Sequence, residues 1–424
     1  MEKNLTTGSV LKSILYFSLP YLLSYFLQTL YGMADLFIIG QFEDISSITA
    51  VSIGSQVMHM ITVMIVGLAM GATVNIGQAI GAGNKKKAAK DIGNTVTLFM
   101  MLAIVLSAIL LFFIKPIVGM MSTPQEAVHE TVIYLTICFL GIPFITAYNI
   151  ISSIFRGMGD SKSPMYFIAV ACGANIVLDY VFIFPLDMGL FGAALATGFS
   201  PAVSMCVMSL HVWRKKNGFA FCRVKEVAKS GLLFCKLGIS AFVNEFATGV
   251  VLTVFNLLIL SISGNTGVAA YGVIANIALV GTAVYTGLSQ GTQPLVSQYY
   301  GKRDHHSTRK LYGFAISTAL LLGAVMIGIA WGFTEPLVSV FNGEGNEALQ
   351  TMAEEGLRLY FIGFLFAGIN IVSAVYLGAV EQAMPSFFIA MSRGVAAILF
   401  FAFLLSALFG MLGIWLAFPA AEGA

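Results

Sequence analysis

The stretch Gly67-Leu-Ala-Met-Gly-Ala-Thr73 has a counterpart 220 residues further along the chain, Gly287-Leu-Ser-Gln-Gly-Thr-Gln293. The same offset joins further pairs of identical residues: Gln78 with Gln298, Gly81 with Gly301, Lys90 with Lys310 and Pro116 with Pro336. After one inserted residue the offset becomes 221, and it joins Gly157 with Gly378, Pro164 with Pro385, Gly189 with Gly410 and Gly192 with Gly413. An offset held over half the chain indicates a duplicated unit of roughly two hundred residues, which in a membrane protein favours a transporter.

Composition assigns the chain to the membrane proteins. Its residues are 58% hydrophobic and 10% charged, and the mean hydropathy is +0.89, whereas soluble domains carry about 25% charged residues. Hydrophobic runs long enough to cross about 30 Å of hydrocarbon recur along the whole length. We therefore expect twelve spans, near residues 13–40, 48–80, 92–114, 131–155, 164–184, 189–212, 233–261, 266–300, 311–333, 356–380, 385–407 and 410–424.

The two copies predict two domains. We expect an N-terminal six-helix bundle at residues 1–213, a cytoplasmic linker at 214–231 and a C-terminal six-helix bundle at 232–424. With the N-terminus in the cytoplasm, nineteen of the 22 Lys and Arg residues lie in cytoplasmic connections, as the positive-inside rule requires. Six spans per copy give both copies the same orientation. The predicted fold is an all-α integral membrane protein of twelve helices in two parallel-repeat bundles, with a last helix about two turns shorter than its counterpart.

Three acidic residues fall within predicted spans: Asp35, Asp179 and Glu245. A charged side chain at the centre of a membrane helix costs about 2.5–3.5 kcal/mol, so we expect all three to face a polar cavity or one another. The alternative is a buried acid that only holds helices together through hydrogen bonds. A basic residue, Arg393, follows Pro385 by eight residues, closely enough for its side chain to extend to the cytoplasmic face, and we expect it to have a structural or phosphate-contacting role.

The neighbours of these acids favour a functional role. Asn175 precedes Asp179 by four residues, so both lie on one face of a helix. Gln28 and Tyr31 precede Asp35 at helical spacing. A buried carboxyl group can take up and release a proton near neutral pH, and carboxylate, amide and hydroxyl oxygens can also bind Na⁺. Residue types do not separate these two alternatives, but both predict a site for a coupling cation.

Other polar residues and two prolines complete the set of candidates. Pro20 and Pro201 lie inside predicted helices, where proline removes a hydrogen bond and introduces a kink, so they are candidate hinges; a static kink is the open alternative. Polar side chains in spans can also serve as packing contacts between helices. Seven of them are candidates for lining a substrate cavity: Gln28, Tyr31, Glu245, Asn256, Asn276, Gln290 and Gln293.

Four short motifs together resemble the MATE (multidrug and toxic compound extrusion) transporters, and the bacterial DinF-like and MepA-like branches most of all. The motifs are Tyr31-Gly-Met-Ala-Asp35, Gly81-Ala-Gly83-Asn-Lys85, Phe155-Arg-Gly-Met-Gly-Asp160 and Asn175-Ile-Val-Leu-Asp179. The resemblance implies a cation-coupling site, for H⁺ or Na⁺, on the first, fifth and sixth helices. By motif its residues are Asp35, Asn175, Asp179 and Thr197. Another branch uses a Glu on the seventh helix and an Asp on the tenth; Glu245 matches the first, but Asn370 stands in the tenth span.

The resemblance implies an antiporter that expels lipophilic, chiefly cationic compounds in exchange for H⁺ or Na⁺, with no cofactor and no metal beyond that Na⁺. We expect a monomer in the bacterial cytoplasmic membrane that binds drug-like molecules and membrane lipids but no nucleic acid. A flippase for lipids or lipid-linked oligosaccharides is the alternative. It predicts a strongly basic cavity, which the sequence of this chain does not indicate. An enzyme is disfavoured because the histidines lack catalytic or metal-binding spacing.

Overall fold

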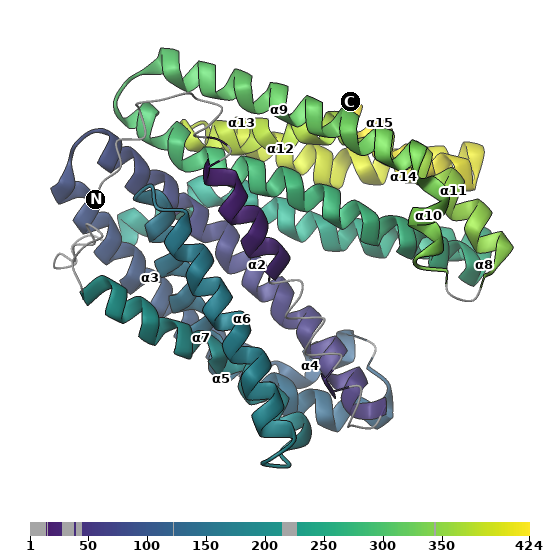
Figure 1. The fold of residues 1–424 in the computed structure, drawn as a ribbon, viewed down its shortest axis with the longest axis horizontal. Helices are drawn as coiled ribbons and strands as arrows, with labels where there is room; N and C mark the ends of the chain where they lie inside the picture. Colours follow the sequence, from purple (N-terminus) through teal and green to yellow (C-terminus); the bar gives the residue numbers. More distant parts are fainter. Residues whose placement is uncertain are drawn as a thin grey trace. The chain divides into compact units, whose positions relative to one another are not determined.

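The computed structural model describes residues 14, 16–27, 38–39, 45–121, 123–213, 227–342 and 345–424. Within this part, the side chains of residue 45 and of residues 227–250, apart from 239, 243 and 249, are outside the description. Asp35, Gln28, Tyr31 and most of the expected linker therefore lie outside the described residues, as does the side chain of Glu245. All regular elements among the described residues are helices (Figure 1). The predicted all-α class is confirmed.

The chain forms two compact units. The first comprises residues 1–7 and 23–238, and the second comprises residues 8–22 and 239–424. The elements of the first unit are α2 (Ile45–Gly81), α3 (Lys85–Phe112), α4 (Ile114–Met120), η1 (Gln125–Ala127), α5 (Val128–Gly157), α6 (Lys162–Ile183) and α7 (Gly189–Trp213). Helix α5 packs against α2, α3 and α7, and α6 packs against α7. Their backbones come close, because a Cβ added to Gly141 of α5 would lie 2.5 Å from the carbonyl oxygen of Gly198 in α7.

The second unit is built from the helices that follow. They are the main part of α8 (Val227–Gly301), then α9 (His305–Gly332), α10 (Thr334–Ser339), α11 (Glu347–Ile362), α12 (Phe364–Ala379), α13 (Ala383–Met391), the π-helical turn η2 (Ser392–Ala396), α14 (Ala397–Phe409) and α15 (Met411–Gly423). Gly264 breaks α8 with a φ of 63°, a conformation that costs glycine little because it has no Cβ. Element α8 therefore consists of two helices, one before and one after Gly264.

The duplication is visible in the helix boundaries. Helices α3 and α9 both contain 28 residues and start 220 positions apart, at Lys85 and His305. Each is preceded by an equivalent cap: Asn84 accepts a hydrogen bond from the amide of Lys87, and Asp304 accepts one from the amide of Ser307. Because the side-chain oxygen satisfies an amide of the first turn, the two copies begin these helices by the same means.

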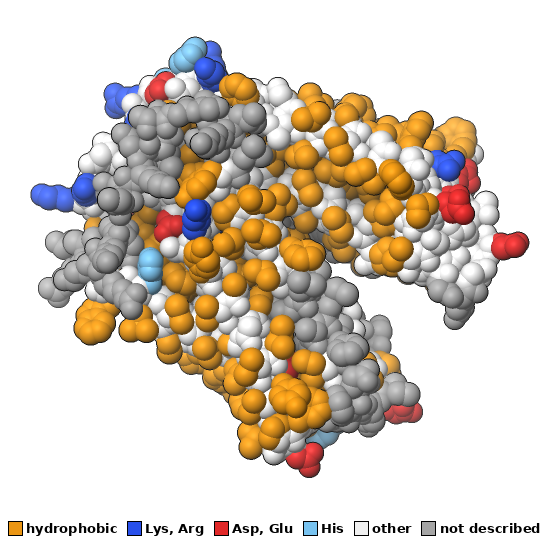
Figure 2. Space-filling model, in the orientation of Figure 1, with side chains coloured by type: hydrophobic (Ala, Val, Ile, Leu, Met, Phe, Trp, Pro, Cys, Tyr) orange, Lys and Arg blue, Asp and Glu red, His pale blue; other side chains and the backbone are white. Residues whose placement is uncertain are grey.

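The helices are suited to a lipid environment. Among the described residues, eight helices are long and apolar enough to cross a membrane, or up to nine when α11 and α12, which bend by 44°, count as one span. Hydrophobic side chains cover much of the visible face of each unit, and charged side chains gather mostly at the ends (Figure 2). With its 13 residues, α15 is shorter than its counterpart α7, which has 25.

Candidate functional site

Helix α6 turns a carboxyl group and an amide into the interior of the first unit. Asp179 is 0% exposed and Asn175 is 1% exposed, one helical turn apart. On the opposite face, Val177 and Tyr180 are 60% and 58% exposed. The helix begins at the Asp160 turn, where this carboxylate accepts hydrogen bonds from the backbone amides of residues 162 and 163 at 3.1 and 3.0 Å. The motif that ends at Asp160 therefore fixes the start of the helix that carries the site.

The amide of Asn175 is available to a ligand. Neither its nitrogen nor its oxygen has a hydrogen-bond partner among the described residues, although both atoms are buried. A buried polar group without a partner costs about 1–3 kcal/mol, so this amide is a candidate ligand for a bound cation. Asp35, the other acid expected at this site, lies outside the described residues.

Thr197 lies on α7, the helix that packs against α6. Its hydroxyl oxygen accepts a hydrogen bond from the hydroxyl of Tyr134 at 3.4 Å. The same tyrosine hydroxyl lies 3.3 Å from the Oγ of Ser55, so three hydroxyl groups connect α2, α5 and α7. The Tyr134 ring packs directly over Gly54, where a side chain would collide with it. Sequence reasoning did not select Tyr134 or Ser55, because a tyrosine in an apolar span is indistinguishable from a packing residue.

The other cavity candidates are divided between buried and exposed positions. Gln293 is buried at 6% exposure, while Asn256 and Gln290 are half-buried. Asn276 is exposed, and its amide nitrogen donates to the carbonyl of Gly272 at 2.8 Å within the same helix. Their role in substrate binding stays a prediction.

The first helix is shared between the two units. Residues 8–22 group with the second unit and residues from 23 onward group with the first. Pro20 lies just before this change, in a stretch that is helical from residue 16 to residue 27. Two glycines of the repeat motif permit the close approach to α8: a Cβ added to Gly291 would lie 2.5 Å from the Oγ of Ser18, and one added to Gly287 would lie 2.7 Å from Cγ of Leu22. The second candidate hinge, Pro201, is buried inside α7, which continues through it.

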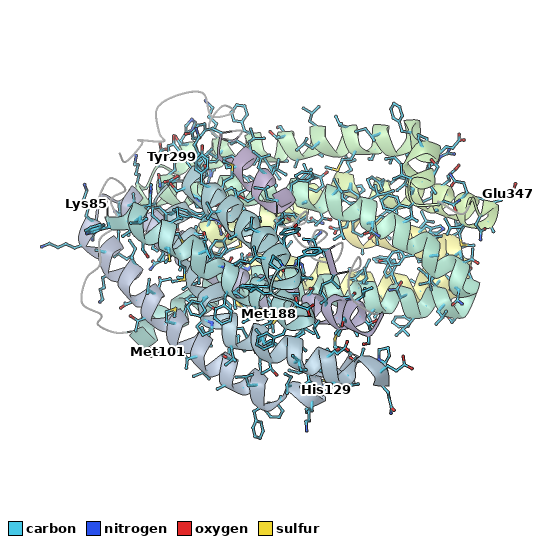
Figure 3. The ribbon with its side chains drawn as sticks, turned by 60° about the horizontal axis from the view of Figure 1, so that its bottom comes forward. Lys85, Met101, His129, Met188, Tyr299 and Glu347 are labelled. Carbon is cyan, nitrogen blue, oxygen red and sulfur yellow. The ribbon has the colours of Figure 1, made fainter. Side chains whose placement is uncertain are left out.

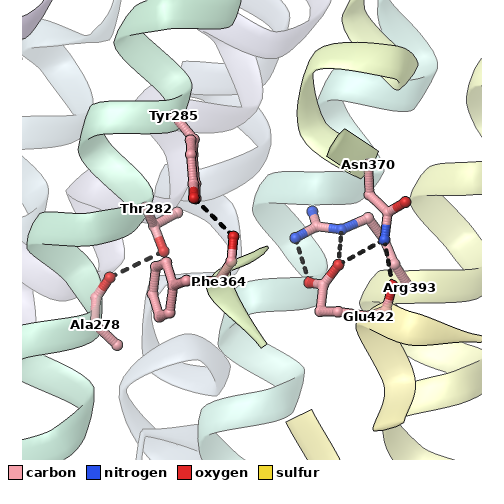
Figure 4. Close-up of polar contacts among 7 residues, drawn as sticks. All are labelled: Ala278, Thr282, Tyr285, Phe364, Asn370, Arg393 and Glu422. Atoms are coloured by element: carbon pink, nitrogen blue, oxygen red, sulfur yellow. Dashed lines mark hydrogen bonds and ion pairs between the residues drawn. The ribbon is translucent and has the colours of Figure 1, made fainter. Parts of the chain in front are cut away.

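A second buried charge cluster lies within the second unit (Figure 4). Glu422 of α15 accepts a hydrogen bond from Nε of Arg393 at 3.0 Å and forms an ion pair through the second guanidinium nitrogen of that residue. It also accepts from the amide of Asn370 at 2.9 Å. The expectation that Arg393 extends to the cytoplasmic face was wrong, since its guanidinium turns inward to a buried carboxylate. Sequence reasoning missed Glu422, although an acid after the apolar run Ile414-Trp-Leu-Ala-Phe418 was a usable signal.

A membrane protein of two homologous helical units, with a buried carboxylate and a buried amide on one spanning helix, has the architecture of a secondary transporter. The chain matches the MatE family model twice, at residues 20–181 and at residues 241–403, once in each copy of the repeat. The chain belongs to the MatE family, a family of transporters rather than enzymes, as the motifs predicted.

Relatives and solved structures agree with this assignment. The chain is 26% identical over 427 residues to the probable multidrug resistance protein YoeA of Bacillus subtilis, covering 97% of this chain and 91% of the relative. It is 24% identical to the multidrug export protein MepA of Staphylococcus saprophyticus, covering 96% and 90%. An outward-facing multidrug resistance MATE family transporter shares the fold with a TM-score of 0.89 at 22% identity, covering 99% and 94%. A MATE in the bent conformation shares it with a TM-score of 0.91 at 21% identity, covering 98% and 92%.

Proposed function

We propose that the protein exports lipophilic, chiefly cationic compounds from the cytoplasm in exchange for H⁺ or Na⁺. The observation that carries this proposal is the fully buried Asp179, with the buried amide of Asn175 one turn before it on a membrane-spanning helix. The names of relatives as multidrug resistance and multidrug export proteins support the class of cargo.

The coupling chemistry follows from the groups on α6 and α7. Asp179 supplies a negative charge, Asn175 supplies an amide oxygen, and the nearby helix α7 supplies the hydroxyl of Thr197. Asp35 would add a second carboxylate. A proton can bind to a carboxylate oxygen directly, whereas Na⁺ would be bound by the carboxylate, amide and hydroxyl oxygens together. Export is coupled when cation and drug favour opposite conformations or compete for shared groups.

Alternating access requires a part of the chain that bends. The first helix belongs to both units, and Pro20 lies two residues before the position where it changes from one unit to the other. Because proline weakens the helix at this point, we assign Pro20 the role of hinge. Pro201 has no such position, so we assign it a structural role within α7.

The distribution of charge within each unit supports a cytoplasmic N-terminus. In the first unit Lys85 and His129 lie at opposite ends, and in the second unit so do Tyr299 and Glu347 (Figure 3). The Lys85 end carries Lys85, Lys86, Lys87 and Lys90, and the Tyr299 end carries Lys302, Arg303, Arg309 and Lys310. Under the positive-inside rule these ends face the cytoplasm of a bacterial cell membrane. We propose that the protein acts as a monomer surrounded by lipid.

Efflux of a cationic dye from proteoliposomes tests the proposed function. With an imposed pH or Na⁺ gradient, the wild-type protein is expected to move the dye, and Asp179→Asn is expected to lose at least about tenfold in rate, because it removes the charge that binds the cation. The matched control is Asp187→Asn, the same change at an exposed turn after the same helix, which should transport normally. Full gradient-driven efflux by Asp179→Asn would refute the proposal. Translocation of a lipid-linked oligosaccharide without dye efflux would instead favour a flippase.

A further inference from the structure

The cluster of Asn370, Arg393 and Glu422 lies deep in the second unit. Glu422 is 11 residues after the start of α15, or about 17 Å along the helix, and Arg393 is 10 residues after the start of α13, or about 15 Å. Both positions are therefore about halfway through a hydrocarbon layer of about 30 Å. The Arg393 and Glu422 side chains are only 12% and 3% exposed. This ion pair is a mid-membrane feature of the fold rather than a surface contact.

The repeat relates this cluster to the proposed coupling site. At an offset of 221, the run α13–η2–α14 corresponds to α6, and α15 corresponds to α7. The glycines that lead into the two last helices, Gly189 and Gly410, both have a positive φ, of 50° and 59°. The helix pair that carries Asp179 and Thr197 in the first copy thus carries Arg393 and Glu422 in the second copy.

The second copy departs from the first where Arg393 lies. Residues Ser392–Ala396 form a π-helical turn, whereas the equivalent residues 171–175 are regular α-helix and end on Asn175. A π-helical turn inside an α-helix is uncommon and is found often at functional sites. Here it contains the residue that bonds to Glu422.

The charges of the two copies differ in one respect. After Lys162, neither α6 nor α7 contains any Lys or Arg, and their buried charge is the acid Asp179. In the equivalent helices, Arg393 and Glu422 are the only charged residues between positions 383 and 423. Two nitrogens of the planar Arg393 guanidinium bond to the Glu422 carboxylate. The side-chain amide of Asn370 donates a further hydrogen bond to it. The carboxylate of the second copy is neutralised by the chain itself.

We propose that Arg393 is a tethered cation: in the second copy it permanently neutralises the buried Glu422 carboxylate, on the helix pair that corresponds to the pair carrying the coupling-cation site in the first copy. This inference rests on the proposed role of Asp179. A tethered cation cannot leave during the transport cycle, so only the first copy exchanges a cation, and one site sets the coupling stoichiometry. It follows that removing the Arg393 charge opens a site for Na⁺ or H⁺, formed by the Glu422 carboxylate and the Asn370 amide oxygen.

The test measures cation binding to the purified protein rather than transport. All variants carry Asp179→Asn, which removes the response of the first copy. The melting temperature is compared in NaCl and in choline chloride at equal ionic strength, and between about pH 8 and about pH 6, because a ligand that binds the folded state raises it. With Arg393 present we expect no Na⁺-specific shift, and the change in melting temperature with pH in this protein, which other titrating groups also cause, is the baseline for the variants. Arg393→Met should gain a shift of several degrees for one of the two cations, and adding Glu422→Gln should abolish that shift.

Two further variants complete the design. Arg393→Lys keeps the tethered charge and should gain no response. Asn370→Asp keeps Arg393 but adds a second carboxylate, so the cluster again carries a net negative charge and should gain a cation response. This variant decides the matter if Arg393→Met fails to fold. Absence of a gained response in a folded Arg393→Met or in Asn370→Asp protein overturns the inference, as does a response that survives Glu422→Gln.

The proposed function fails by a different result. Normal gradient-driven efflux by the Asp179→Asn protein would show that the coupling site is not at Asp179 in the first copy. The comparison among Arg393 variants reads only cation binding in the second copy, so the two failures are distinguishable.

Discussion

At the scale of the residue, Arg393 and Glu422 show how charges are kept inside a helical unit of a membrane protein. Their side chains are almost completely buried and bond through two nitrogens of the guanidinium. A buried ion pair is weak evidence for stability as a whole, because both charges lost their hydration, but removing one partner leaves the other uncompensated. The pair therefore behaves as a unit.

A stability measurement on single and double variants tests that unit. Arg393→Met is expected to lower the free energy of unfolding by about 3–5 kcal/mol, because it strands the Glu422 carboxylate. Arg393→Met with Glu422→Gln should recover most of the loss. Lys86→Met, a charge removal at an exposed position in the first turn of helix α3, should change stability by less than about 0.5 kcal/mol. Denaturant unfolding in detergent gives these values; equal losses in the single and double variants would contradict the coupling.

At the scale of the element, α3 and α9 begin with equivalent caps of different charge. Hydrogen bonds from the side chain and then the backbone amide of Ser307 lower the pKa of the exposed Asp304 below its ordinary 3.8. A lowered pKa means that the cap stabilises the folded state above the unfolded pKa, and that this contribution is lost as the pH falls through the folded pKa. Asn84, the cap of α3, does not titrate.

Thermal unfolding of the two cap variants separates these behaviours. Asp304→Ala should lower the melting temperature at about pH 7, and the difference from wild type should diminish at about pH 3, where Asp304 is increasingly protonated. Asn84→Ala should give a loss that does not titrate between the same pH values. A deficit of Asp304→Ala that persists unchanged well below pH 3 would show that the carboxylate charge is not the source of the cap's contribution.

Sequence reasoning succeeded for the elements and was incomplete for the sites. Hydropathy and the 220-residue offset predicted the spans, because a lipid-exposed helix must be apolar and a duplicated helix keeps its turn glycines. The π-helical turn at Ser392–Ala396 has no such signature, and it contains Arg393, whose side chain bonds to the buried Glu422. Tyr134 was missed for a similar reason, since its hydroxyl contacts with Ser55 and Thr197 depend on the packing of three helices.

At the scale of the whole molecule, the first helix contributes residues to both units, as α8 does. If Pro20 is the hinge, Pro20→Ala should restore the missing backbone hydrogen bond and stiffen the helix. We expect dye binding to persist while the efflux rate falls several-fold. Pro164→Ala, at the first turn of α6 where proline is tolerated, is the matched control and should transport at the wild-type rate. Unchanged efflux by Pro20→Ala would exclude a hinge at this position.

The two copies of the repeat carry different buried charges. The first carries a buried acid on α6 with a buried amide beside it, and the second neutralises its own acid with Arg393. Duplication supplied the same helix framework twice, and we propose that the different charges on equivalent helices let only the first copy exchange a cation for drug.

Drug-driven cation flux measures that exchange most directly. In proteoliposomes without any imposed ion gradient, a gradient of cationic dye should drive H⁺ or Na⁺ in the opposite direction, detected by an internal pH or Na⁺ indicator. The wild-type and Asp187→Asn proteins should show this flux, and Asp179→Asn should not. Dye movement by the wild-type protein with no opposing flux of either cation, or an undiminished flux through Asp179→Asn, would contradict the account.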